Sequence, residues 1–539
     1  MPRLAANDLP SVWGGGQLLA FSALDGATDY ENGLTARTSV AGAGVRVMLP
    51  GDLELRFDGR APLSAVVAGD FFDLATAGGR VRGVFPDTCH LLIDGPVAMG
   101  EVPATLAVKR KGARTLVGAA ARFDAARVDA DLDAAIRERR RWLEARSVPD
   151  GLTGGRRRAF VKALSIMKTQ VMSAEGRIRR RWTTPDRWPH RAMWLWDSAF
   201  HAVGWRHVDV ALAREMLEAV MDGQLPDGMV PHMISPMRSS DVTQPPVLAM
   251  AAELVDRTAP DAEWLARLYP ALCRYVRWDM ANRDTDGDGL LEWKVETNPV
   301  CRCGESGLDN SPRFDKHDYL NAVDFNAFLA RECQALAAIA ARLGLKADAA
   351  EWTETSRRVC ARINERLWDE QTGLYLDRPC GGERLPILAA TGFLPLICGA
   401  PSAAQAQRLA AHLDDPKTFG VGLPVATVAP RTSPDYSKDM WRGPVWANLN
   451  WLIAGGFERC GQPEAARRIR ERTLDEIARW YDRCGSIFEY YDDESKVAPP
   501  DLLRKGRCDP SNPYRQVVHD YGWTATLFVD MAMAGAATS

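Results

Sequence analysis

The sequence predicts an N-terminal antiparallel β-sandwich followed by a large all-α domain. Short segments that alternate apolar and polar residues, separated by Gly, Asp and Pro, fill the chain from about residue 10 to residue 128. Helical periodicity dominates beyond residue 155. The length of 539 residues accommodates one large domain with a smaller one, or three small domains.

The N-terminal strands are expected where the alternation is clearest. Gly, Asp and Pro at residues 50–52 and 77–79 mark turns between them. Frequent turns between short strands are typical of a sandwich, which we assign to residues 1–128. The clearest expected strands are 45–49, 53–57, 81–85 and 104–109.

A charged helix is expected next, within residues 129–154, and Pro and Gly residues near its end break it. Its basic cluster at residues 137–141 indicates a solvated helix face or a linker packed between domains. We therefore assign residues 129–154 to a linker helix and residues 155–539 to the helical domain.

Amphipathic helices joined by long loops rich in Trp, Asp, Gly and Pro are expected in the remainder of the chain. Periodicity alone supports a large all-α domain and no finer fold. The expected helices cover residues 158–174, 208–221, 261–283, 324–343, 348–368, 402–413, 446–455, 464–484 and 523–533.

Composition excludes several classes of protein. A net charge of -3 gives no reason to expect nucleic acid or an anionic membrane as a partner. The N-terminus lacks the apolar core of a signal peptide, and no run of 18 apolar residues could span a membrane. The 11 cysteines are an odd number without repeating spacing, which indicates reduced thiols. We expect a cytoplasmic protein.

The most informative stretch is Glu305–Arg313, which packs two carboxylates, an amide and an arginine into a turn. Gly307 and Pro312 keep it from being a plain helix. Such a turn buries little apolar surface, so we interpret it as presenting groups to a ligand. About 180 residues later Glu489 is followed by Tyr490 and Tyr491. Two acidic groups far apart in sequence, one of them next to aromatic residues, are typical of a glycosidase that uses two carboxylates.

Other loops carry candidate sugar-binding groups, and 17 tryptophans supply flat apolar faces for sugar rings or for the core. In the loop 193–201, Asp197 follows Trp196 and is either a hydroxyl ligand or a helix N-cap. Gln244 binds hydroxyls or serves ordinary loop structure. The stretch 440–451 contains Trp441, Arg442 and Trp446, a combination that indicates a sugar-subsite wall rather than a simple helix start.

The turn 284–292 begins with the D-x-D-G-D-G spacing of an EF-hand, but Val295 occupies the position of the bidentate glutamate. We therefore expect a tight turn between helices, with a different kind of calcium site left open. Trp293 follows this turn.

Read together, these loops resemble glycoside hydrolase family 63 and its relatives with (α/α)6 catalytic domains, including the trehalases. The likeness covers residues 155–535, and its E-S-G-x-D-N-S-P element is most similar to bacterial enzymes that cleave mannosylglycerate and glucosylglycerate. The resemblance implies an (α/α)6 toroid with Asp309 as general acid and Glu489 as general base. The β domain looks like an addition to those compact hydrolases. The motifs that carry the resemblance are Trp196-Asp197, Glu305–Arg313, Trp441–Trp446 with Asn450, and His519–Thr524.

The implied reaction is inverting hydrolysis of a small carbohydrate without a metal or organic cofactor. The two carboxyls would lie about 6.5–9.5 Å apart, with room for a water. Asp309 must stay protonated near neutral pH, which requires apolar surroundings or a second nearby acid such as Glu305. The expected substrate-binding residues are Trp196, Asp197, Gln244, Trp293, Glu305, Gly307, Asn310, Trp441, Arg442, Trp446 and Tyr490.

The leading expectation is an exo-acting α-glycosidase on a small or terminal α-glucoside. A trehalase, or a hydrolase of another α-glycoside such as a mannoside or rhamnoside, is the alternative within the class. An (α/α)6 sugar epimerase that uses histidines and a non-catalytic carbohydrate-binding protein are alternatives outside it. The sequence does not specify the role of the sandwich or the oligomeric state. The histidines near the motif loops are His190, His201, His232, His317 and His519.

Overall fold

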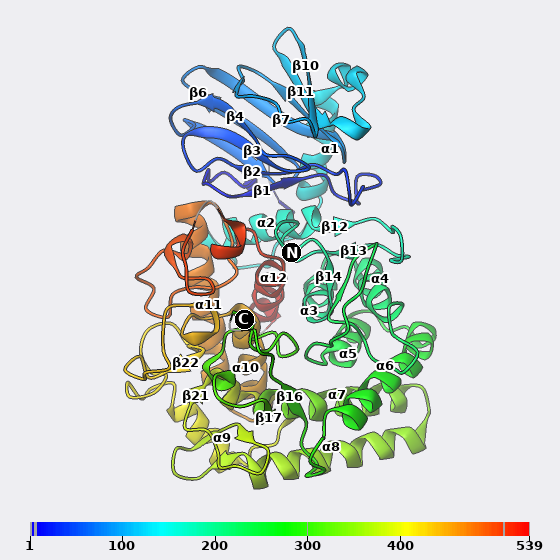
Figure 1. Ribbon diagram of the computed structural model, residues 1–539, viewed down its shortest axis with the longest axis vertical. Coiled ribbons are helices and arrows are strands. Elements are labelled where there is room, and N and C mark those ends of the chain that lie inside the picture. Colours follow the sequence, from blue (N-terminus) through cyan, green and yellow to red (C-terminus); the bar gives the residue numbers. More distant parts are fainter. Residues whose placement is uncertain (1–2, 5–7, 299, 510–511, 538–539) are drawn as a thin grey trace. The chain divides into compact units, whose positions relative to one another are not determined.

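The computed structural model describes residues 3–4, 8–298, 300–509 and 512–537 (Figure 1). The chain forms two compact units, and both are assembled from segments that are distant in sequence. The first unit comprises residues 1–192, 477–489 and 518–539. The second unit comprises residues 193–476 and 490–517. The two units are described separately.

The first unit begins with two antiparallel sheets, drawn in blue and cyan in Figure 1. The expected strands 45–49, 53–57, 81–85 and 104–109 correspond to β3, β4, β7 and β10. One sheet has the strand order β1 (Leu18–Ala20), β2 (Thr35–Thr38), β3 (Ala43–Leu49), β4 (Leu53–Asp58) and β9 (Ala98–Met99). The other has the order β10 (Leu106–Lys111), β11 (Arg114–Ala119), β8 (His90–Asp94), β7 (Gly79–Asp87), β6 (Phe71–Thr76) and β5 (Ser64–Ala68).

One apolar core joins these two sheets. Val45 and Leu55 of the first sheet and Leu91 and Val117 of the second are fully buried in it. In β4 the burial alternates along the strand, as the sequence pattern predicts for a sheet with one face in the core. The antiparallel sheets expected near the N-terminus are therefore present.

Three α-helices among the described residues belong wholly to this unit, and buried ion pairs tie two of them to the loops between strands. The helices are α1 (Leu132–Glu144), α2 (Gly154–Thr169) and α12 (Gly522–Ala537). Lys168 of α2 forms ion pairs with Asp25 at 2.9 Å and with Asp70 at 2.5 Å, and Arg139 of α1 pairs with Asp25 at 2.9 Å. Burial and the neighbouring Asp70 raise the pKa of Asp25 to about 6, against the opposing effect of the two cations. The basic cluster of α1 is thus partly packed and partly solvated.

The second unit is predominantly helical, as expected beyond residue 155. In Figure 1, α7 (Val323–Arg342) and α8 (Lys346–Arg366) run side by side in green and yellow-green. The helix α11 (Pro463–Cys484) belongs to this unit up to Glu476. The other helices are α3 (Leu195–Trp205), α4 (Val210–Met221), α5 (Leu248–Thr258), α6 (Ala262–Asn282), α7 (Val323–Arg342), α8 (Lys346–Arg366), α9 (Ala403–Ala411) and α10 (Ala447–Arg459).

Short two- and three-residue strands join the loops of the helical part. β16 (Glu292–Lys294), β17 (Tyr319–Asn321) and β20 (Arg378–Pro379) form one antiparallel sheet of the second unit. The two-stranded sheets are β12 (Val171–Met172) with β13 (Trp182–Thr183), β14 (Met193–Trp194) with β15 (Met233–Ile234), β18 (Trp368–Asp369) with β19 (Leu374–Tyr375), and β21 (Leu388–Ala389) with β22 (Val428–Ala429).

Two sequence expectations about helices were wrong. The loop 193–201 is mostly helix α3, so Trp196 and Asp197 lie in a first helical turn. Helix α5 was not expected at all. The expected helix 446–455, in contrast, is present as α10, which begins at Ala447. Every residue of α3 is buried, so that helix lacks the polar stripe that reveals an amphipathic helix. Helix α5 does carry polar residues at helical spacing, Glu253, Asp256 and Arg257, so its sequence held a signal that was missed.

Among the described residues, no helix combines the length and the apolar character needed to cross a membrane. The 11 cysteines are free thiols, which agrees with the interpretation of their number and spacing. Six of them are at least partly accessible: Cys301, Cys360, Cys380, Cys460, Cys484 and Cys508.

We expect Leu91→Ala to destabilise the first unit by about 2–5 kcal/mol, because it leaves a cavity in a closely packed core. Leu63→Ala is the matched control, since Leu63 is 79% exposed, and it should change stability by no more than about 0.5 kcal/mol. Urea unfolding followed by circular dichroism measures both variants. Equal unfolding midpoints for the two variants would contradict the shared core.

Candidate active site

The turn that carries Asp309 is rigid because its glycine and serine make specific contacts. Ser306 Oγ donates to the Cys303 carbonyl at 2.9 Å and accepts the Leu308 N–H at 3.0 Å. Gly307 has a φ of +70°, and a Cβ there would lie 2.3 Å from the ring of Trp196. Only glycine combines this backbone angle with so close an approach. The indole of Trp196 therefore lies directly against the turn.

Arg313, at the end of the same stretch, is a buried anchor. Its guanidinium donates to both carboxylate oxygens of Asp324 at 2.7 and 2.9 Å and to both oxygens of Asp377. Asp324 also accepts the indole N–H of Trp293 at 2.9 Å. Trp293 stacks on Phe325 with ring centroids 3.8 Å apart and is fully buried. These contacts fix the turn to the start of α7.

The side chain of Asp309 is 24% exposed and forms an ion pair with Lys505, whose Nζ lies 2.9 Å from Oδ2. Lys505 reaches this place because Asp439 accepts the backbone N–H of Gly506 at 2.8 Å and Leu503 N–H donates to the Lys438 carbonyl at 3.1 Å. The charged partner of Asp309 is therefore a cation, and not the neighbouring acid that the sequence offered as one alternative. The other alternative, apolar surroundings, stays a prediction.

Glu305 faces a cation instead of Asp309. Both of its carboxylate oxygens accept hydrogen bonds from Arg283, one of them at 3.1 Å. The side chain is only 3% exposed. Glu305 thus secures the beginning of the turn to the end of α6, and its predicted contact with a sugar stays a prediction.

Asn310 connects the acid turn to the stretch 439–446. Its Oδ1 accepts the backbone N–H of Trp441 at 3.1 Å, and its Nδ2 donates to the carbonyl of Asp439 at 3.4 Å. Its own carbonyl accepts a hydrogen bond from Arg442 at 3.1 Å. Arg442 is also paired with Asp315 at 2.8 Å. Both residues predicted to bind sugar hydroxyls therefore also hold the loop in place.

Four of the predicted aromatic residues form a continuous series of rings. The centroids of Trp196 and Trp441 are 6.3 Å apart, and Trp441 stacks on Trp446 at 3.5 Å with an interplanar angle of 8°. Trp446 meets Tyr490 at 4.7 Å. The Tyr490 hydroxyl donates to the Leu503 carbonyl at 2.6 Å. All four rings are almost completely buried, so packing explains their contacts, and a role as a sugar wall remains a prediction.

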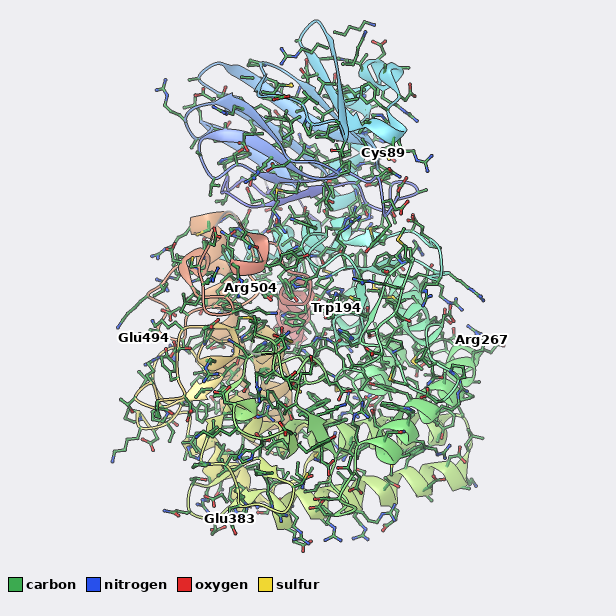
Figure 2. All side chains as sticks on the ribbon, viewed as in Figure 1. Cys89, Trp194, Arg267, Glu383, Glu494 and Arg504 are labelled. Carbon is green, nitrogen blue, oxygen red and sulfur yellow. The ribbon has the colours of Figure 1, made fainter. Side chains whose placement is uncertain are left out.

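Gln244 and Asp197 are also buried. Gln244 Oε1 accepts the backbone N–H of Trp196 at 3.3 Å, and its carbonyl accepts the hydroxyl of Tyr275 at 2.9 Å. Asp197 is 2% exposed in the first turn of α3. Trp194, which is labelled in Figure 2, precedes this helix and packs edge-on against His232 at 4.9 Å.

Glu489 belongs to the first unit and is 3% exposed. Its backbone N–H donates to the carbonyl of Val518 at 3.0 Å. One of its carboxylate oxygens, Oε2, accepts the N–H of the same residue at 3.3 Å. The preceding residue, Phe488, pairs with His519 as an antiparallel bridge. The carboxylate is therefore oriented by the backbone of the neighbouring segment.

The histidines that motivated the epimerase alternative are largely desolvated. Burial lowers the pKa of His201 to about 3, of His519 to about 3 and of His232 to about 4. These three rings are neutral near neutral pH. His190 bonds Asp186 at 2.5 Å within the first unit.

The turn 284–292 is tight, as expected, although a strand rather than a helix follows it. The carboxylates of Asp284, Asp286 and Asp288 lie within 4.8 Å of one another. Glu292 accepts the backbone N–H groups of Thr285 and Asp286, so hydrogen bonds within the chain account for the turn.

Sequence reasoning missed Lys505 and did not assign a role to Arg313. Lys505 has no aromatic or acidic neighbours in sequence that would have singled it out. The residue before it, Arg504, is labelled in Figure 2 and is buried, donating to the Tyr514 carbonyl at 2.9 Å. Only the folding of the segment 503–506 onto Asp439 brings the Lys505 ammonium to Asp309.

The segment 189–524 matches the family described as the mannosylglycerate hydrolase MGH1-like glycoside hydrolase domain. A mannosylglycerate hydrolase of Thermus thermophilus is 31% identical over 397 residues, covering 58% of this chain and 92% of that protein. The glucosylglycerate hydrolase of Mycolicibacterium hassiacum is 26% identical over 407 residues, covering 57% and 87%. A solved GH63 mannosylglycerate hydrolase from Thermus thermophilus, in complex with glucose, is 28% identical with a TM-score of 0.57, covering 69% of this chain and 99% of that one.

We expect Gly307→Ala to lower the urea unfolding midpoint more than Gly287→Ala does. Both glycines have a positive φ, +70° and +72°, so both variants incur a backbone cost of about 1–2 kcal/mol. A Cβ at Gly287 meets nothing within 4 Å, whereas one at Gly307 collides with Trp196. The difference between the two urea midpoints measures the effect of the collision between the new Cβ and the Trp196 ring. Equal midpoints would contradict the close approach of the indole to Gly307.

Proposed function

The chain belongs to the MGH1-like family of glycoside hydrolases, and on that premise we propose that it is an inverting, exo-acting α-glycosidase of small substrates. Glycoside hydrolysis is the activity that its relatives share by name. The observation that carries the proposal is the family match over residues 189–524, which includes both Asp309 and Glu489. We further propose that the helices form the (α/α)6 toroid that the resemblance implies.

In the proposed reaction Asp309 donates its proton to the glycosidic oxygen while the bond from that oxygen to the anomeric carbon breaks. Glu489 takes a proton from the water that attacks the anomeric carbon from the opposite face. The products are the free aglycone and a sugar of inverted configuration. The Val518 N–H supports this role of Glu489 because it fixes the orientation of the carboxylate through Oε2.

The aglycone we propose is a small anion such as glycerate, joined to glucose or mannose. Two relatives are named for hydrolysis of mannosylglycerate and glucosylglycerate. In a glycoside of the 2-hydroxyl of glycerate, which is the linkage we propose, the carboxylate is attached to the carbon that carries the glycosidic oxygen. A general acid works within about 2.6–3.2 Å of that oxygen. With Lys505 Nζ 2.9 Å from Asp309 Oδ2, the substrate carboxylate would come within ion-pair reach of Lys505.

In the proposed complex the Lys505 ammonium exchanges its ion pair with Asp309 for one with the substrate carboxylate. A neutral α-glucoside, the broader expectation from the sequence, provides no such exchange of partners.

An (α/α)6 epimerase is the second candidate from the sequence, and the state of the histidines argues against it. A general base is most efficient when its pKa lies near the working pH. The depressed pKa values of His201 and His232, about 3 and about 4, leave them weak bases.

Asp309→Asn and Glu489→Gln should each lower kcat by at least about 100-fold, because general acid and base catalysis contribute about that much or more. Both substitutions preserve side-chain volume, so circular dichroism and the urea midpoint should stay close to those of the unaltered protein. Steady-state hydrolysis with released sugar as the readout measures the loss. Near-normal turnover in either variant would remove that residue from the mechanism.

Proton NMR during hydrolysis of α-linked substrates should show early release of the β-anomer. The panel is glucosylglycerate, mannosylglycerate, glucosylglycerol, trehalose, kojibiose and nigerose. Glucosylglycerate should exceed neutral glucosylglycerol in kcat/KM by about 10- to 100-fold, the range expected for a hydrogen bond to a charged group. Early release of the α-anomer would establish retention and contradict the assigned roles.

Two lysine variants test whether Lys505 causes the preference for glucosylglycerate over neutral glucosylglycerol. Lys505→Met should reduce the preference for the charged substrate toward unity, whereas Lys496→Met should leave it unchanged, because Lys496 is 74% exposed and pairs with Glu494. An unchanged preference in Lys505→Met would show that another group recognises the carboxylate.

A further inference from the structure

The first strand of the sandwich and the segment that ends at Glu489 belong to one unit and meet around a buried carboxylate. Asp520 Oδ2 accepts hydrogen bonds from Lys162 Nζ at 2.7 Å and from the backbone N–H of Leu18, in β1, at 2.8 Å. Its Oδ1 accepts hydrogen bonds from the Ser486 hydroxyl at 2.8 Å and from the Ile487 N–H at 3.4 Å. One side chain thus binds β1, α2 and the segment before Glu489.

Gln17, beside Leu18 in sequence, makes a second connection. Its Nε2 donates to the carbonyls of Gly485 at 2.5 Å and Val12 at 3.2 Å, and its Oε1 accepts the Gly14 N–H at 3.0 Å. Gln17 is fully buried, and its bond to Gly485 is made away from solvent. Its amide therefore holds the start of the segment 485–489 against the turn that leads into β1.

The turn before β1 also lies extremely close to the same segments. A Cβ on Gly14 would lie 1.7 Å from the carbonyl oxygen of Cys484, and one on Gly16 would lie 2.5 Å from Nδ1 of His519. Arg37 of β2 donates to the carbonyls of Gly16 at 2.7 Å and His519 at 3.1 Å. Glycine at residue 14 lets the two backbones approach, and glycine at residue 16 leaves room for the imidazole ring of His519.

These contacts reach Glu489 through a short antiparallel pairing. Tyr521 N–H donates to the Ile487 carbonyl at 3.0 Å, and Glu489 N–H donates to the Val518 carbonyl at 3.0 Å. The Val518 N–H in turn donates to the Glu489 carboxylate at 3.3 Å. The donor that orients this carboxylate is therefore held in place by the segment that Asp520, Gln17 and β1 secure.

We infer that β1 and the glycine turn before it are a positioning element for Glu489, with Gln17 and Asp520 as positioning residues. The inference rests on the proposed function, in which Glu489 is the general base. The matched family segment begins at residue 189, so the sandwich contacts come from a part of this chain outside the match. The added β domain thus contributes to hydrolysis through the orientation of one carboxylate.

The test is hydrolysis by Gln17→Ala of two substrates, an α-glycoside and the matching α-glycosyl fluoride. Fluoride leaves without protonation, so the fluoride reaction still needs the base but not Asp309. We expect kcat to fall by about 10- to 100-fold on both substrates with KM unchanged, the loss that a displaced catalytic group produces. Asp309→Asn, in contrast, should recover much of its activity on the fluoride.

Leu91→Ala is the control, because it weakens the sandwich core without touching residues 484–489 or 518–521. At a temperature where circular dichroism shows it folded, its kcat should equal that of the unaltered protein. Ser486→Ala removes a single hydroxyl from Asp520 and serves as the second variant if Gln17→Ala does not fold. Its kcat should fall on both substrates in the same way.

The outcomes separate the two proposals. Full fluoride activity in folded Gln17→Ala, or in Ser486→Ala if that variant replaces it, overturns the inference and leaves the hydrolase assignment intact. Equal losses in Leu91→Ala and Gln17→Ala also overturn it, because general weakening of the sandwich would then account for the effect. Full activity in Glu489→Gln removes the proposed function on which the inference rests.

Discussion

The buried carboxylate of Asp520 is the interaction on which the first unit depends. Removing such a charge from water costs several kcal/mol unless a cation and enough donors replace the solvent. Lys162, a serine hydroxyl and two backbone N–H groups provide them, and they come from α2, β1 and the segment before Glu489. Because the carboxylate is satisfied only when all of these meet, the strands and the Glu489 segment have one compatible arrangement.

A buried cation plays the corresponding part in the second unit. The guanidinium of Arg313 pairs with the carboxylates of both Asp324 and Asp377. Asp324 also accepts a hydrogen bond from the indole N–H of Trp293. The turn around Asp309 is polar and buries little apolar surface, so its order has to come from hydrogen bonds and ion pairs. Arg313 supplies that order at one end and the Glu305–Arg283 pair supplies it at the other. Asp309 is left as the partly exposed carboxylate of an otherwise buried network.

Three tryptophans predicted to bind sugar serve packing in the second unit. Trp196, Trp441 and Trp446 are buried and stacked, and together they link α3, the stretch 440–446 and Tyr490. Large rigid rings with few rotatable bonds lose little entropy on being fixed. A series of such rings gives the loops of the second unit a stiff support, and Trp196 extends that support to the turn around Asp309.

The sequence by itself determined much of the local structure. Alternation predicted β3, β4, β7 and β10, periodicity predicted α4 and α6 to within a few residues, and the E-S-G-x-D-N-S-P motif singled out Asp309. Each of these patterns lies within a short stretch of the chain, so the sequence alone reveals it.

Tertiary structure alone decided the rest. Helix α3 escaped prediction because its 11 residues are all buried, which removes the periodic contrast. The approach of Lys505 to Asp309, and of Gln17 to the Glu489 segment, joins residues far apart in sequence. No local pattern encodes such pairs, since their distances are set by the packing of whole elements and by the need to satisfy every buried polar group.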